Sequence, residues 1–175
     1  MEITGIICEY NPFHKGHAYH LARARELAGA DFVVCAMSGS VTQRGVFARH
    51  DKWTRARMAL ACGADLVLEL PFPFASGSAR RFAEGGVAAL AALGADTLAF
   101  GSESAELPAI MAAAGRTLEA DFSEKEKYFS LSVCESITFN VIAIEIEVNS
   151  KSATEFVSLI FSQRLYFLPS FYSFF

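Results

Sequence analysis

The stretch Glu26–Val34, ELAGADFVV, joins the end of a predicted helix to a predicted strand, and its layout recurs twice more. ACGADLVL at 61–68 and ALGADTLAF at 92–100 show the same order of helix, Gly-Ala-Asp and strand. Glycine commonly ends a helix, because it adopts left-handed backbone angles without strain. A helix that ends in glycine and leads directly into a buried strand is the repeating unit of a parallel α/β sheet.

Outward from these junctions, four short apolar runs fit strands that are buried on both faces. They are Ile3–Cys8, Phe32–Met37, Leu66–Leu70 and Thr97–Phe100. Predicted helices follow them at Ala18–Ala28, Lys52–Cys62, Ala79–Leu93 and Pro108–Leu118. Right-handed crossovers between parallel strands place helices on both faces of the sheet. The alternation therefore predicts an α/β fold, a Rossmann-like doubly wound parallel sheet.

The composition of the chain changes near Asp121. All 12 glycines lie in residues 1–120, whereas residues 121–175 hold nine of the 16 phenylalanines. Because short turns and helix ends use glycine, we expect residues 1–120 to form a domain and 121–175 to be an atypical tail. This tail would be foreign, divergent or a truncated remainder of the domain. The alternative is a small β-rich extension, because Ile137–Val148 alternates well enough to include a strand.

Composition narrows the classes of protein. With 175 residues, 53% of them hydrophobic, and a net charge of −4, the chain can bury one core. No apolar run is long enough for a membrane span and no signal peptide is recognisable, so we expect a soluble intracellular protein. The four cysteines are scattered, which argues against a zinc site and a disulfide framework and favours buried thiols. A P-loop and a G-x-G-x-x-G turn are absent, which argues against the usual NTPase and dinucleotide sites.

Polar residues, glycines and prolines gather after the predicted strands, at residues 9–17, 38–45, 71–73 and 101–103. The carboxyl ends of parallel strands share one edge of the sheet, where open α/β sheets bind their ligands. We therefore expect these four loops to meet at one edge.

The strongest functional signal is His14-Lys15-Gly16-His17, an H-x-G-H between a strand and a helix. Gly16 would let a phosphate approach the backbone, and a helix from about His17 would offer it free N–H groups. Histidines that donate to an α-phosphate as charge builds on it would stabilise nucleotidyl transfer, without a nucleophilic side chain. We therefore expect His14 and His17 to be catalytic.

Residues 41–58 carry five Lys or Arg against one Asp. Such a stretch could neutralise nucleotide phosphates or an RNA backbone, and a solvated helix face would look much the same. Arg44 and Lys52 remain possible ligand contacts, whereas Arg55 and Arg57 are expected on the surface.

Other residues have simpler interpretations. His20 extends the helix face of His17, Glu69 is expected to form a buried ion pair, and Trp53 is expected to anchor packing. Ser102 and Glu103 would cap the last predicted helix.

The segments CEYNPFHKGHAYHL, MSGSVTQRG, DKWTRARMAL, ADLVLELPFPFA and FGSE together resemble the tRNA(Met) cytidine acetate ligase family of the H-x-G-H nucleotidyltransferase superfamily. The resemblance covers nearly all of residues 1–120. It implies a cytoplasmic bacterial enzyme that uses ATP, accompanied by magnesium, to activate acetate as acetyl-adenylate. The enzyme then acetylates the wobble cytidine of elongator tRNA(Met) to 4-acetylcytidine, with no membrane partner.

The resemblance also implies the residues that contact ATP, which belong to the first loop, the helix after it and the fourth strand. They are Ile7, Cys8, Glu9, Tyr10, Asn11, Pro12, Phe13, His14, Lys15, Gly16, His17, Ala18, Tyr19, His20 and Gly101, with His14 and His17 matching the superfamily histidines.

The chain departs from the family in its later part. Members are considerably longer and use an Asn in an NxILxIEY-like stretch and an Arg in an SATAIR-like stretch. Asn140 and Ser152-Ala153-Thr154 faintly echo these stretches, but Val157 stands where the arginine is expected. The region that should recognise tRNA is largely absent, so activity is expected to be impaired. The alternatives are a cofactor-forming nucleotidyltransferase and a non-catalytic, truncated nucleotide-binding fragment.

Overall fold

The structure, a computed structural model, describes residues 1–102, 130–134 and 140–145. Its centre is a six-stranded sheet in the order β3-β2-β1-β4-β6-β5. The strands are β1 (Ile3–Cys8), β2 (Phe32–Ser38), β3 (Leu66–Leu70), β4 (Thr97–Ser102), β5 (Ser130–Cys134) and β6 (Asn140–Glu145). Strands β1 to β4 are parallel, as predicted. Strand β6 pairs antiparallel with both β4 and β5.

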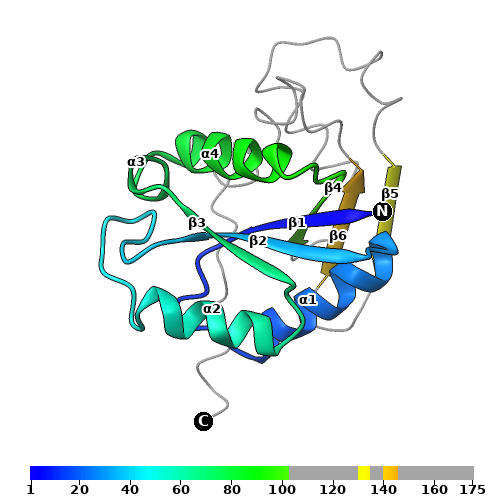
Figure 1. Cartoon of the computed structure of the whole chain (residues 1–175), viewed down its shortest axis with the longest axis horizontal. Coiled ribbons are helices and arrows are strands. Elements are labelled where there is room, and N and C mark those ends of the chain that lie inside the picture. The colour runs from blue at the N-terminus through cyan, green and yellow to red at the C-terminus, as the bar shows by residue number, and fades with distance from the viewer. Residues whose placement is uncertain (103–129, 135–139, 146–175) are drawn as a thin grey trace.

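Helices cover both faces of this sheet. They are α1 (Lys15–Ala28), α2 (Lys52–Ala61), α3 (Phe72–Ala75) and α4 (Ala79–Ala92). Figure 1 shows α1 and α2 on one side of the strands and α4 on the other, the arrangement of a doubly wound fold. None of the helices within the described residues is long and apolar enough to cross a membrane.

Two differently built layers hold the helices to the sheet. Alternate strand residues such as Ile6 and Cys35 form a buried cluster with Leu21 of α1 and Ala59 of α2. On the other face α4 approaches β1 closely, since a Cβ on Gly5 would lie 2.6 Å from Leu90 Cδ1. Small residues at this contact therefore set the spacing between α4 and the sheet.

The predicted elements agree closely with the observed ones. Each of the four predicted strands is present, and β2 and β4 run slightly longer than predicted. The short helix α3 was not predicted, and β3 is a partly exposed edge strand instead of being buried on both faces. The predicted helix Pro108–Leu118 lies outside the described residues. Strand β6 falls within Ile137–Val148, in agreement with the alternative prediction of a β-rich extension.

The three Gly-Ala-Asp junctions all lie at the amino ends of the parallel strands. Their glycines, at 29, 63 and 94, have φ of +60°, +111° and +76°, conformations that suit glycine. Each aspartate then pairs reciprocally with a neighbouring strand: Asp65 donates its N–H to the Val33 carbonyl, and its carboxylate accepts the Val33 N–H at 2.6 Å. Asp31 does the same with Glu2, and Asp96 with Ile3.

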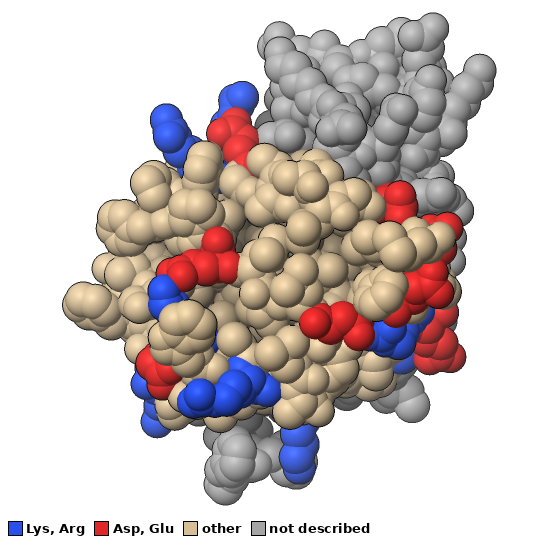
Figure 2. Space-filling model, in the orientation of Figure 1, with Lys and Arg blue, Asp and Glu red and all other residues tan. Residues whose placement is uncertain are grey.

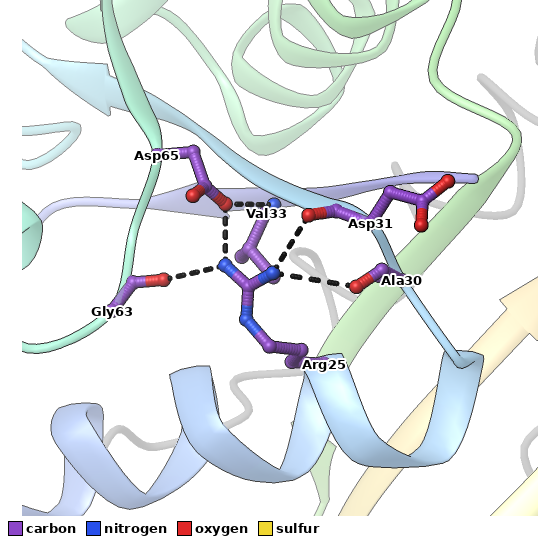
Figure 3. A network of polar contacts seen from close by, with 6 residues as sticks. All are labelled: Arg25, Ala30, Asp31, Val33, Gly63 and Asp65. Atoms are coloured by element: carbon purple, nitrogen blue, oxygen red, sulfur yellow. Dashed lines mark hydrogen bonds and ion pairs between the residues drawn. The ribbon is translucent and has the colours of Figure 1, made fainter. Parts of the chain in front are cut away.

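Arg25, near the end of α1, completes the junction between β2 and β3 (Figure 3). Its guanidinium donates to the Asp31 carbonyl at 2.8 Å and the Gly63 carbonyl at 3.0 Å, and it forms an ion pair with Asp65. The three Gly-Ala-Asp segments thus fix the register of the parallel strands.

Candidate functional site

The loops predicted to meet do lie at the carboxyl edge of the sheet. In Figure 1 the connections that leave β1, β2 and β3 gather on the left, opposite the Gly-Ala-Asp junctions. Strand β1 pairs with β4 through Gly5 and Leu98, and extending that register places Gly101 level with Cys8. His14 and Gly101 therefore belong to the same edge, as predicted.

His14 is the N-cap of α1, so this helix begins at Lys15, three residues earlier than predicted. The His14 Nδ1 accepts the Gly16 N–H at 3.1 Å, and the His17 Nδ1 accepts the His14 N–H at 3.3 Å. The two histidines thus form a reciprocal capping box, with imidazoles in place of the usual hydroxyl and carboxylate. The early helix start was missed because histidine is not a common capping residue.

The role expected for Gly16 changes with this geometry. A Cβ on Gly16 would lie 3.0 Å from Cε1 of His14, so the glycine lets the imidazole fold over the helix start. The Gly16 N–H already has the His14 ring as its acceptor, and the His17 N–H donates to the His14 carbonyl at 2.9 Å. A phosphate that binds the Gly16 N–H must therefore replace the His14 ring.

The same contacts fix the tautomer of both imidazoles. A backbone N–H can only donate, so each Nδ1 must be unprotonated. The proton of each neutral ring is then on Nε2, which is the atom that could donate to a phosphate oxygen. The rings stack with centroids 3.6 Å apart, so the two imidazoles lie side by side at the start of α1.

Burial keeps these histidines neutral. Burial lowers the pKa of His17 to about 3, with smaller contributions from the neighbouring His14 and His20. Burial also lowers the pKa of His14, and it lowers that of His20 to about 4. At neutral pH the site therefore offers uncharged hydrogen-bond donors. His20 is fully buried in α1.

The Tyr10 ring packs against the rings of His17 and Phe13. Its ring lies 4.8 Å from that of His17 and 4.9 Å from that of Phe13, and its hydroxyl is 3.4 Å from the Cys35 Sγ. Its φ of 48° is in the left-handed region, which costs a bulky residue about 1–3 kcal/mol. The strained backbone at Tyr10 therefore allows its ring to be buried against the H-x-G-H segment.

Arg55 was expected on the surface, and that prediction is wrong. The side chain is fully buried, because it lies on the same helix face as buried Ala59. Its guanidinium donates to the carbonyls of Glu9 at 2.6 Å, Ser38 at 3.0 Å and Gly39, and its Nε to that of His50 at 3.0 Å. Arg55 thus joins the ends of β1 and β2 to the start of α2. Sequence reasoning missed it because a charge run normally lies on the surface.

The loop after β2 is also attached to the first loop by side chains. A Glu9 carboxylate oxygen accepts the Gln43 N–H at 2.6 Å, and the Asn11 side-chain oxygen accepts the Arg49 N–H at 2.7 Å. These bonds place residues 43–49 beside the H-x-G-H segment. The resemblance assigns Glu9 and Asn11 to ATP contacts. In the structure their side chains also hold the two loops together.

The remaining candidates divide between paired and exposed residues. Lys52 forms an ion pair with half-exposed Glu69, so Glu69 is paired but not buried, and Arg44 is exposed. Trp53 is 66% exposed, so the predicted packing role is wrong. Arg57 is exposed, as predicted.

The other residues assigned to ATP lie along this same edge. Ile7 and Cys8 are buried at the end of β1, and Lys15, Ala18 and Tyr19 occupy the first turns of α1. Pro12 and Phe13 are half-buried in the loop between them. Cys8 and Cys35 are buried as predicted, whereas Cys62 is exposed.

Strand β6 adds one late residue to this edge. Asn140, which echoes the family's later asparagine, stands opposite Ser102 in the register of β6 with β4, beside Gly101. The segments that hold Glu103, Ser152-Ala153-Thr154 and Val157 lie outside the described residues. The described residues contain no group of three or more His, Cys, Asp or Glu side chains arranged to hold a metal ion.

Known proteins share this architecture. The model of the HIGH Nucleotidyl Transferase family matches residues 1–156. The chain belongs to this family. The match extends past Asp121 and includes both β5 and β6.

Curated relatives carry one common name. The tRNA(Met) cytidine acetate ligase of Syntrophotalea carbinolica is 58% identical over 110 residues, which are 63% of this chain and 26% of that protein. The enzyme of the same name from Exiguobacterium sibiricum is 54% identical over 121 residues, 69% of this chain and 32% of that protein. The chain thus spans about a quarter to a third of the length of these relatives.

A solved structure shares both sequence and fold. Thermotoga maritima TmcAL, crystallised with alpha-thio ATP, superposes with a TM-score of 0.65 at 44% sequence identity. The superposition covers 73% of this chain and 31% of that protein.

Proposed function

We propose that this chain carries the adenylate-forming site of a tRNA(Met) cytidine acetate ligase. It would bind ATP and acetate at the carboxyl edge of the sheet and form acetyl-adenylate, whose acetyl group goes to the wobble cytidine of elongator tRNA(Met). The observation that carries the proposal is the pair of neutral, stacked imidazoles at the start of α1. The names of the relatives and the ATP analogue bound to the Thermotoga protein support it.

The chemistry requires a site that stabilises charge on the α-phosphate. An acetate oxygen attacks the α-phosphorus and pyrophosphate leaves, so negative charge builds on the non-bridging oxygens of that phosphate. Neutral imidazoles with the proton on Nε2 can donate to these oxygens, and a buried site makes such hydrogen bonds stronger than they would be in water. In the second step the cytidine amino group attacks the acetyl carbonyl and AMP leaves.

The loops would hold the nucleotide while these bonds change. The positive end of α1 favours a phosphate, and the buried Arg55 guanidinium adds a positive charge beneath the ends of β1 and β2. Magnesium would arrive bound to the triphosphate of ATP. We assign ATP binding to residues 1–120 and expect the protein to act in the cytoplasm.

Exchange of labelled pyrophosphate into ATP tests the proposal. The reverse of adenylation returns label to ATP, so the expected result with this 175-residue chain is exchange that depends on added acetate and is slower than in a full-length relative. Exchange with another acceptor would support a cofactor-forming nucleotidyltransferase. Absence of exchange in this chain, while a full-length relative is active, would support a non-catalytic fragment.

Two substitutions separate catalysis from helix capping. His14→Asn keeps a good N-cap residue, and His17→Gln keeps an acceptor at the third position of the capping box. Each should lower acetate-dependent exchange by roughly two to three powers of ten, as when one preorganised donor is removed. ATP affinity and melting temperature should change far less. Loss of folding with normal turnover in the remaining folded protein would show that the histidines are structural.

A further inference from the structure

We infer that the loop after β2 and the first turns of α2 form an RNA-stacking surface, made by Arg44, Phe47, Arg49, Trp53 and Arg57. This inference rests on the proposed function and names the place where the acceptor RNA contacts this domain. It is called the aromatic–arginine surface below.

Its aromatic side chains have no role in the core of the domain. Phe47 is 83% exposed and Trp53 is 66% exposed, whereas side chains of this size usually bury most of their area. The Lys52 Nζ lies over one face of the Trp53 ring, 5.2 Å from its centroid. Both rings therefore offer faces on which a flat, polarisable group can stack.

The charge around these rings is positive. Arg44, Arg49 and Arg57 are exposed, and Arg57 lies one helical turn after Trp53, on the same face of α2. Two carboxylates lie near them: Asp51 accepts the Thr54 N–H at 2.9 Å as the cap of α2, and Glu69 forms an ion pair with Lys52. Aromatic faces flanked by arginines suit unpaired bases joined by phosphates.

The position of the surface matches the proposed reaction. Residues 43–49 are attached to the first loop by the Gln43–Glu9 and Arg49–Asn11 hydrogen bonds. The aromatic–arginine surface therefore borders the edge where acetyl-adenylate would form, and an RNA stacked there would lie close to the activated acetyl group. In Figure 2 uncharged side chains dominate the left side of the molecule, where this edge lies, with a few basic and acidic groups between them.

RNA fits this surface better than a protein partner does. Protein interfaces also use aromatic residues and arginine, but they surround a fully buried core that is mostly apolar. Here arginines alternate in sequence with the aromatic residues, which is the combination that neutralises a backbone while stacking its bases.

Trp53 is the single tryptophan of the chain, so its fluorescence reports directly on this surface. The probe is a transcript of the anticodon stem-loop of elongator tRNA(Met), added without ATP or acetate. We expect it to bind and to quench the tryptophan emission. An abasic oligonucleotide of the same length should bind through its phosphates with little quenching.

Substitutions test the assignment. Phe47→Ala should weaken binding about tenfold, and Trp53→Ala, followed by a dye on the RNA, should do the same, while Trp53→Phe should recover most of the affinity. Arg49→Gln and Arg57→Gln should each reduce the slope of log affinity against log salt by about 0.7–0.9. Phe32→Ala is the matched control, because Phe32 is also exposed but lies at the opposite edge of the sheet.

The outcomes separate this inference from the proposed function. Unchanged affinity in the Phe47 and Trp53 variants, or quenching by RNA equal to that by the abasic oligonucleotide, would overturn the stacking surface even if acetate-dependent exchange persists. A concentration-dependent dimer that both alanine variants abolish, without RNA binding, would assign the surface to a second copy and also overturn the inference. Loss of exchange with retained RNA binding would instead contradict the proposed function alone.

Discussion

Both edges of the parallel sheet use charged side chains to hold the backbone, but the two edges pair these charges differently. At the amino edge, Asp31, Asp65 and Asp96 each close a reciprocal pair with a neighbouring strand, and Arg25 adds an ion pair. At the carboxyl edge, Arg55 holds four backbone carbonyls without a carboxylate partner among its hydrogen bonds.

The fold thus separates the residues that fix the sheet from the residues that prepare the site. The charged side chains of the amino edge are partly exposed and paired with one another. They therefore fix strand register at a modest cost in free energy. The carboxyl edge buries an arginine, neutral imidazoles and a strained tyrosine, which costs stability but prepares donors for an anionic ligand. Substitutions at the two edges should therefore have different effects on stability and on ATP binding.

Acid should produce the largest effect, and it should act through the carboxyl edge. The folded pKa values of His17 and His20, about 3 and about 4, lie below the ordinary 6.5, so the unfolded chain binds more protons. The contribution of these two neutral histidines to the free energy of unfolding is complete above about pH 6.5. It is lost as the pH falls toward their pKa values in the folded protein. We expect the free energy of unfolding to drop by several kcal/mol between pH 6.5 and 4, measured by denaturant titration.

The variants that check this cause replace the two buried rings. His17→Gln, His20→Gln and their combination should flatten the pH dependence between pH 6.5 and 4. A wild-type stability that stays flat over this range would contradict the burial of neutral histidines at the carboxyl edge.

Arg55 should give the next largest effect. Arg55→Met leaves the carbonyls of Glu9, Ser38, Gly39 and His50 without this donor, which should cost about 3 kcal/mol or more. Arg55→Lys can restore only part of the fork and should cost less. The amino-edge counterpart, Arg25→Lys, should cost about 1 kcal/mol, because that ion pair is about one-third exposed.

ATP binding distinguishes the two arginines further. For Arg55→Lys, ATP affinity should fall at a pH and temperature where the variant is folded, because the loops it orders border the site. For Arg25→Lys, ATP affinity should be unchanged. Equal losses of stability and of affinity in both variants would remove the distinction between the edges.

Asp65 should give a smaller effect than Arg55. Asp65→Ala removes the acceptor of the Val33 N–H and the partner of Arg25, which should cost about 1–2 kcal/mol in thermal or denaturant unfolding. Asp65→Asn keeps an oxygen for the Val33 N–H and should cost less. Neither variant should change acetate-dependent exchange per folded molecule, and a large loss there would show that the amino edge contributes to the site.

Much of the fold could be predicted because local signals agree with tertiary structure. The bounds Ile3–Cys8 and Leu66–Leu70 coincide with β1 and β3, since each run is apolar and bounded by turn residues. The Gly-Ala-Asp repeat predicted the junctions between helix and strand. Strand β5 escaped prediction because SLSVC is short and weakly patterned.

The site could be located but not detailed from the sequence. The H-x-G-H segment and the topology together placed His14 and His17 at the carboxyl edge. The capping box is local, but it uses two histidines, which are not common capping residues. The strained Tyr10 and the burial of Arg55 depend on contacts between segments far apart in sequence, such as the 46 positions that separate Arg55 from Glu9. No local pattern encodes such contacts, so a charged residue on a helix was assigned to the surface.

The nitrogen NMR spectrum of the four histidine side chains reports the tautomer of each ring and its response to ATP. At neutral pH the account predicts neutral rings with the proton on Nε2 for both His14 and His17. Addition of ATP should shift the nitrogen resonances of these two residues and leave those of exposed His50 in place. Protonated or Nδ1–H rings at His14 and His17, or an ATP response confined to His50, would contradict an α-phosphate site at the carboxyl edge.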